Sequence, residues 1–203
     1  MQEYADRYLT FRDITPEELN SFKQEFEKLV KISLWNTNGT QYLSKNPPHT
    51  GRVKALTELF PDAKFVFLMR NPYTVFESTR NFFQNTIKPL ELHSISLEQM
   101  EQNILRNYVE LYKAYKEQKT ILDAGHLYEV RFEDIEADAL GITQQIYQQL
   151  NLPGWEEARP AIEKYINGKK GYKKNRYDYD PRTVQLVNEH WGDILDEWGY
   201  ERL

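Results

Sequence analysis

Residues 64–83, KFVFLMRNPYTVFESTRNFF, contain the pattern on which the fold prediction depends. The run 64–69 is almost wholly apolar, as expected for a parallel strand that is covered on both faces. After Arg70, the side chain of Asn71 is suited to cap a helix, and Pro72 is suited to its first position. We therefore predict a strand at 64–69, a tight turn and a helix that continues to about Phe83.

Strand and helix patterns alternate along the rest of the chain, which has 203 residues and suits a single domain over 1–203. This alternation predicts an α/β fold with a parallel sheet and flanking helices. Only three segments have a good strand pattern, so the predicted sheet is thin. The predicted strands are 40–45, 64–69 and 126–132, and the further helices are about 16–32, 52–60, 96–121, 138–150, 155–166 and 181–198.

Composition excludes several classes of function. The net charge is −5, whereas a general nucleic-acid binder is usually basic, so we expect no nucleic-acid partner. The absence of cysteine excludes disulfides, thiolate metal sites and a cysteine nucleophile. No apolar run approaches the roughly 20 residues that span a bilayer, and the N-terminus lacks an apolar signal core. We therefore expect a soluble, cytoplasmic protein without a membrane segment.

Arg70 and Ser78 are the residues of this unit with chemistry suited to an anion. In open α/β sheets, ligands bind beyond the carboxyl ends of the strands, and Arg70 lies at such an end. A guanidinium together with a hydroxyl can bind a phosphate group. Taken alone, the pair has a second interpretation, because an arginine at a strand end often forms a structural ion pair.

Residues 44–79, SKNPPHTGRVKALTELFPDAKFVFLMRNPYTVFEST, resemble the sulfotransferase family that uses PAPS (3′-phosphoadenosine-5′-phosphosulfate). The resemblance consists of a lysine before a proline-containing turn, an F-P-D-A-K turn, a strand that ends in R-N-P, and a helix with a serine. It covers nearly the whole chain, since five other segments also resemble the family. These are YADRYLTFRDITPEEL (4–19), EVRFEDI (129–135), IYQQLNLP (146–153), YKKNRYDYD (172–180) and WGDILDEWGYE (191–201).

The resemblance implies a fold related to the P-loop kinases, with PAPS as sulfuryl donor and PAP as product. It implies that Arg70 and Ser78 bind the 3′-phosphate and that Phe132 packs near the adenine. Lys170 and Gly171 resemble a late basic loop that contacts the same phosphate in the family. The alternatives for this loop are a solvated basic segment or an alignment shifted to the next lysines.

The resemblance also suggests catalytic groups. Lys45 matches the family lysine that helps the leaving group, and His49 is a candidate for the base that removes the acceptor proton. The alternatives for His49 are a turn histidine bonded to nearby backbone, or a base supplied from outside this chain. Sulfuryl transfer requires no metal in principle, and the sequence suggests no metal cluster.

The family's 5′-phosphosulfate loop, which reads like P-R-S-G-T-T, has no counterpart in the sequence, because Gly39 belongs to an Asn-Gly turn. Without the strand of that loop, the predicted sheet has unpaired edges through which the chain could self-associate. We interpret the chain as the C-terminal part of a longer sulfotransferase, and expect it alone to bind PAP weakly and to show no turnover. The alternatives are a non-catalytic nucleotide-binding or interaction module and a P-loop kinase relative. The acceptor stays open among small alcohols, amines, glycans, lipids and peptides.

Overall fold

The structure, a computed structural model, describes residues 7–90, 94–169 and 177–203. The chain forms two compact units. The first unit comprises the residues up to Ala63 together with Glu110–His126, and the second comprises Lys64–Val109 together with Leu127–Leu203. Each unit is described by itself.

The first unit is helical. Its principal helix, α2 (Pro16–Thr37), begins with the predicted capping box, in which Thr15 and Glu18 bond reciprocally, and ends at Asn38 in the left-handed conformation. The helix is longer than predicted because no helix-breaking residue precedes Asn38. The other elements of the unit are η1 (Pro47–Gly51), α3 (Val53–Leu59), the last residues of α5 (Leu97–Gln118) and η4 (Lys119–Ile121).

The strand predicted at 40–45 is wrong. This segment has no regular structure, and Leu43 within it is 93% exposed. A strand is stabilised by backbone hydrogen bonds to a neighbour, and no segment of the described chain pairs with 40–45. The two prolines at 47 and 48 instead begin the short helix η1.

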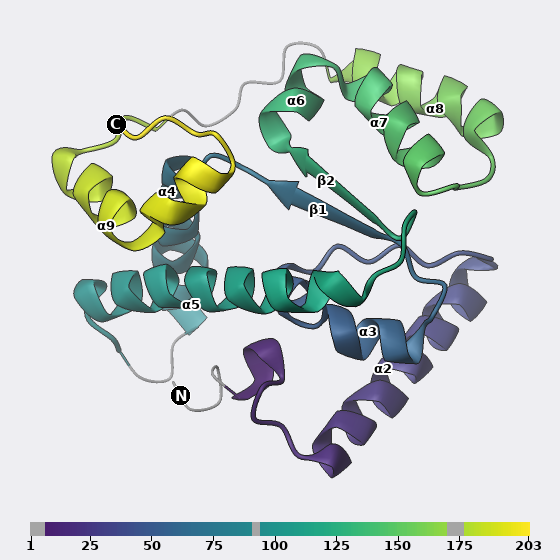
Figure 1. Ribbon diagram of the computed structural model, residues 1–203, viewed down its shortest axis with the longest axis horizontal. Coiled ribbons are helices and arrows are strands. Elements are labelled where there is room, and N and C mark those ends of the chain that lie inside the picture. Colours follow the sequence, from purple (N-terminus) through teal and green to yellow (C-terminus); the bar gives the residue numbers. More distant parts are fainter. Residues whose placement is uncertain (1–6, 91–93, 170–176) are drawn as a thin grey trace. The chain divides into compact units, whose positions relative to one another are not determined.

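The second unit contains the sheet. Strands β1 (Phe65–Met69) and β2 (Leu127–Arg131) pair in parallel, as Figure 1 shows. In the register of this pair, Phe65 lies opposite Leu127 and Met69 lies opposite Arg131. The parallel α/β architecture is thereby confirmed, with two strands in the described residues rather than three. Each strand leads directly into a helix, β1 into α4 (Pro72–Phe82) and β2 into α6 (Phe132–Ala137).

The prediction that both faces of the first strand are covered is wrong within the described residues. Met69 is buried, but Val66 is 46% exposed and Leu68 is 49% exposed. Because alternate side chains of a strand point to opposite faces, these two exposed residues lie on one face of β1. An apolar sequence alone therefore did not reveal which face is packed.

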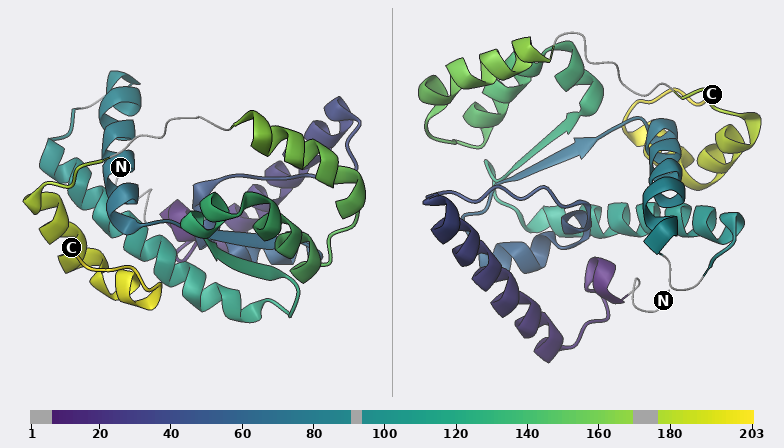
Figure 2. Two further views of the ribbon diagram at one scale, coloured as in Figure 1. Left: turned by 90° about the horizontal axis from the view of Figure 1, so that it is seen from above. Right: turned by 180° about the vertical axis from the view of Figure 1, so that it is seen from behind.

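The core of the second unit lies where α4, α5 and α9 (Pro181–Glu197) meet, and α4 and α9 are in direct contact (Figure 2). Trp191 of α9 is fully buried there, and its indole nitrogen donates to the carbonyl of Leu105 at 2.9 Å. Phe76 of α4 packs edge to face against the Trp191 ring, with 5.8 Å between the ring centroids. The other elements of the unit are η2 (Phe83–Ile87), η3 (Lys88–Leu90), α7 (Ala139–Gln149) and α8 (Trp155–Gly168).

No helix in the described part of the chain is long and apolar enough to cross a membrane.

Candidate functional site

Arg70 lies at the carboxyl end of β1, as predicted, and is half-buried. Its guanidinium carbon lies 4.4 Å from the centre of the Phe132 ring, which is a cation–π contact. In the part of the chain that the structure describes, the Arg70 side chain makes no hydrogen bond or ion pair. Its N–H groups are therefore available to a ligand, and the structural ion pair considered for Arg70 is absent among these residues.

Ser78 lies two turns into α4 and is half-buried. Its hydroxyl has no hydrogen-bond partner among residues 7–90, 94–169 and 177–203. The helix that carries it is fixed at its start, because the Asn71 side-chain oxygen accepts from the amides of Tyr73 at 3.0 Å and Thr74 at 3.3 Å. Strand, turn, cap and helix thus follow one another as the sequence predicts.

Glu133 holds the turn after Arg70 in place and was missed by the sequence prediction. One of its carboxylate oxygens accepts from the backbone amide of Asn71 at 3.0 Å, and the other accepts from the Tyr200 hydroxyl at 2.7 Å. Burial, together with the hydrogen bond to Glu133, raises the pKa of Tyr200 well above its usual range. The only signal in the sequence was the position of Glu133 directly after Phe132.

A network of charges ties α4 to α5 and α9. Arg80 donates to both carboxylate oxygens of Glu77 at 2.7 Å and to Glu101 at 3.3 Å, while Arg182 pairs with Glu101 at 2.5 and 3.0 Å. Thr183 adds a hydrogen bond of 2.8 Å to Glu77. Both carboxylates are buried, so these arginines are committed to structural partners, whereas Arg70 is not.

The predicted catalytic residues Lys45 and His49 both belong to the first unit. Lys45 is exposed and forms no ion pair within the described ranges. His49 is half-buried and its ring lies 5.2 Å from that of Phe26, edge to face. Neither ring nitrogen has a hydrogen-bond partner among the described residues. The hydrogen bond to nearby backbone, which was the alternative role considered for His49, is therefore not seen. Burial and the nearby charge of Arg52 lower the pKa of His49, which favours the neutral imidazole.

Lys170 and Gly171 lie outside the described residues. Among the residues that are described, no group of three or more histidine, aspartate or glutamate side chains is arranged to hold a metal ion.

Comparison with known proteins decides the family. A model of the sulfotransferase family matches residues 2–157. The chain belongs to this family. Among the curated sulfotransferases, two are 32% identical over 197 residues, which is 97% of this chain: the omega-hydroxy-beta-dihydromenaquinone-9 sulfotransferases Stf3 of Mycobacterium bovis and Mycobacterium tuberculosis. The chain spans about half the length of these relatives, since it covers 50% of each.

Two solved sulfotransferase structures share the fold. Sulfotransferase STF9 from Mycobacterium avium matches with a TM-score of 0.64 and 17% identity, over 80% of this chain and 43% of that one. The sulfotransferase domain from the curacin biosynthetic pathway matches with a TM-score of 0.52 and 14% identity, over 89% of this chain and 69% of that one. The P-loop-kinase-like fold predicted from the sequence is thereby confirmed.

Proposed function

We propose that this sulfotransferase chain takes part in sulfuryl transfer from PAPS and binds the 3′-phosphate of that donor through Arg70 and Ser78. The observation that carries the proposal is the uncommitted guanidinium of Arg70, which lies at a strand end directly before a capped helix. An enzyme that uses PAPS must bind two anionic groups, and the site at β1 has the chemistry for one of them.

The geometry around Arg70 suits a phosphate on a nucleoside. The ring of Phe132 lies against the guanidinium in a cation–π contact, and the N–H groups of the guanidinium can bind phosphate oxygens. The same ring offers an apolar surface for a base. Ser78 adds a hydroxyl that can donate to the phosphate. Glu133 holds the peptide between Arg70 and Asn71, so the position of the cation is set before a ligand binds.

In the proposed reaction, an acceptor oxygen attacks the sulfur of PAPS, the bond between sulfur and the bridging phosphate oxygen breaks, and PAP leaves. The acceptor proton passes to a base. We propose Lys45 as a cation that stabilises the leaving oxygen and His49 as the base, on the strength of the family resemblance at residues 45–52. The lowered pKa of His49 leaves it neutral and able to accept a proton.

For the acceptor we propose an alcohol, and a lipid alcohol in the first instance. Both Stf3 relatives are named for a dihydromenaquinone that carries an omega-hydroxyl group. At 32% identity, the shared residues support the same class of nucleophile more strongly than the same molecule.

Titration of PAP and of adenosine 5′-phosphate, which lacks the 3′-phosphate, tests the donor assignment. We expect PAP to bind at least about tenfold more tightly, because charge-assisted hydrogen bonds to the extra phosphate are formed only by PAP. Ser78→Ala should reduce this preference, whereas Ser94→Ala, at an exposed serine of the same unit, should not. Equal binding of the two nucleotides would contradict the assignment.

Transfer of a radiolabelled sulfuryl group from PAPS to an alcohol separates this function from the alternative of a non-catalytic nucleotide-binding module, provided that it is measured with the full polypeptide that the gene encodes, since the chain alone is expected to show no turnover. A non-catalytic module would bind PAP but leave the label on the nucleotide.

A further inference from the structure

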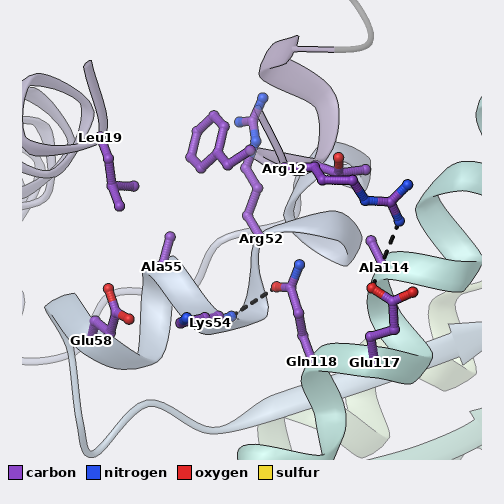
Figure 3. A pocket seen from close by; sticks show the side chains of 11 residues that line it. Arg12, Leu19, Arg52, Lys54, Ala55, Glu58, Ala114, Glu117 and Gln118 are labelled. Carbon is purple, nitrogen blue, oxygen red and sulfur yellow. Dashed lines mark hydrogen bonds and ion pairs between the residues drawn. The ribbon is translucent and has the colours of Figure 1, made fainter. Parts of the chain in front are cut away.

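A cavity of about 300 Å³ lies within the first unit, and none of the residues that line it is assigned above to the donor. It is bounded by residues 10–12, α2, α3 and the end of α5, and Figure 3 shows it from close by. One part of its wall is apolar, and another part carries two cations besides Arg12. The apolar side chains are Phe11, Leu19, Ala55 and Ala114, and the cations are Arg52 and Lys54.

Arg52 has no counter-charge within the described residues. Its guanidinium carbon lies 4.5 Å from the centre of the Phe11 ring and 5.6 Å from that of Phe22. One terminal nitrogen donates to the carbonyl of Tyr8 at 2.5 Å, but Nε is buried and has no hydrogen-bond partner. A half-buried cation without a carboxylate loses part of its hydration, and aromatic faces together with one carbonyl offset that cost only in part.

The other charged groups of the cavity and the Gln118 amide are already engaged. Arg12 pairs with Glu117 at 3.7 Å, as the dashed line in Figure 3 marks, and Glu58 pairs with Lys23 at 2.6 Å. Both halves of the Gln118 amide are used, one by the backbone amide of Lys54 at 2.9 Å and the other by a backbone carbonyl at 3.0 Å.

The amino group of Lys54, in contrast, has no hydrogen bond or ion pair in the described part of the chain. Two positive charges of this wall, those of Arg52 and Lys54, are therefore left without a negative partner beside an apolar surface.

We propose that this cavity is a binding site for a small organic anion, whose carboxylate or sulfate-ester group contacts Arg52 and Lys54 while its apolar part packs against Phe11 and Leu19. The volume is at the lower end of the range for small-molecule sites and suits a ligand of about one ring with a short substituent. The site does not depend on the proposed donor chemistry, because none of its residues is assigned to PAPS.

Nuclear magnetic resonance titration of the ¹⁵N-labelled chain with four probes tests the proposal. Benzoate and phenyl sulfate carry the charge and the ring, benzyl alcohol carries the ring alone, and inorganic sulfate carries the charge alone. We expect saturable shifts of the amides of Phe11, Arg52 and Lys54 with benzoate or phenyl sulfate, and at least about tenfold weaker binding of benzyl alcohol. The tighter of the two charged probes identifies the anionic group.

Two variants locate the binding. Arg52→Gln should weaken binding of the charged probe by about tenfold, and Lys54→Gln by about threefold, because the lysine is exposed and its charge is screened. Lys54→Gln provides the test if Arg52→Gln does not fold. Lys31→Gln, an exposed lysine on α2 outside the cavity, is the matched control and should bind as the unmodified chain does.

The proposal is overturned if the charged probes give no saturable shifts, or if they bind Lys54→Gln as tightly as the unmodified chain. Inorganic sulfate that binds as tightly as benzoate and phenyl sulfate would also overturn it, because the apolar wall would then contribute nothing.

Discussion

Arg70 in the second unit and Arg52 in the first are alike in one respect and different in another. Each guanidinium lies over a phenylalanine ring, at 4.4 and 4.5 Å, and neither has a carboxylate partner among the described residues. Arg70, however, stands at a strand end with its N–H groups uncommitted, whereas Arg52 donates to a carbonyl of residue 8 and lines a cavity. The surroundings of an unpaired cation therefore indicate which ligand it suits. Those of Arg70 suit an exposed phosphate, and those of Arg52 suit an enclosed organic anion.

The charge network of the second unit provides the contrast to both. Glu101 is 1% exposed and balances Arg80 and Arg182, so Glu101→Ala should lower the free energy of unfolding by about 2–3 kcal/mol, because Arg182 loses its carboxylate and Arg80 loses one of its two buried carboxylate partners. Urea titration measures this change. Glu98→Ala, at an exposed position of the same helix, should stay within about 0.5 kcal/mol. A small effect of Glu101→Ala would remove the distinction between committed and uncommitted arginines.

Glu133 tests whether Arg70 is held in place before the ligand binds. Glu133→Ala leaves the amide of Asn71 without its acceptor and frees the turn, so PAP affinity should fall by about fivefold, equivalent to about 1 kcal/mol. Affinity for adenosine 5′-phosphate should change less, which a general loss of structure would not produce. Glu133→Gln keeps one acceptor oxygen and should restore most of the affinity. Equal losses for both nucleotides would show that Glu133 has only a structural role.

The pH dependence of stability tests the environment of His49 in the first unit. The pKa of His49 in the folded chain lies below 6.5, the usual value for histidine. As the pH falls, His49 therefore binds its second ring proton in the unfolded chain before it does so in the folded chain. Its contribution to stability is therefore full above pH 6.5 and decreases from there down to the lowered pKa. His49→Phe keeps the ring packing but has no titrating group. Its free energy of unfolding, measured by urea titration, should therefore change less between about pH 7.5 and about pH 5.5 than that of the unmodified chain. His190→Asn serves as the control, and an unchanged pH dependence in His49→Phe would contradict the assignment.

The sequence predicted the second unit well because its signals are local. The cap of Asn71, the first-turn position of Pro72 and the apolar run before them lie within ten residues, and the structure contains the strand and helix that they indicate. The same holds for the capping box at Thr15 and for the helix that begins at Pro181.

Features that depend on distant partners were missed or wrong. Residues 40–45 resemble a strand, but a strand also needs a neighbour, and the described chain offers none. The bond from Asn71 to Glu133 joins residues 62 positions apart and follows from the register of β1 with β2. The cavity beside Arg52 likewise depends on helices that meet only in the folded unit. The assignments of Lys45, His49, Lys170 and Gly171 stay predictions.

Titration of PAP against the unmodified chain and against Arg70→Ala tests the central claim most directly. The account predicts that Arg70→Ala folds normally and binds PAP at least about tenfold more weakly, because a charge-assisted contact to the 3′-phosphate is lost. It also predicts that affinity for adenosine 5′-phosphate changes little, so that the preference for the 3′-phosphorylated nucleotide disappears. Equal binding of PAP by the two proteins would contradict the assignment of Arg70 to the donor.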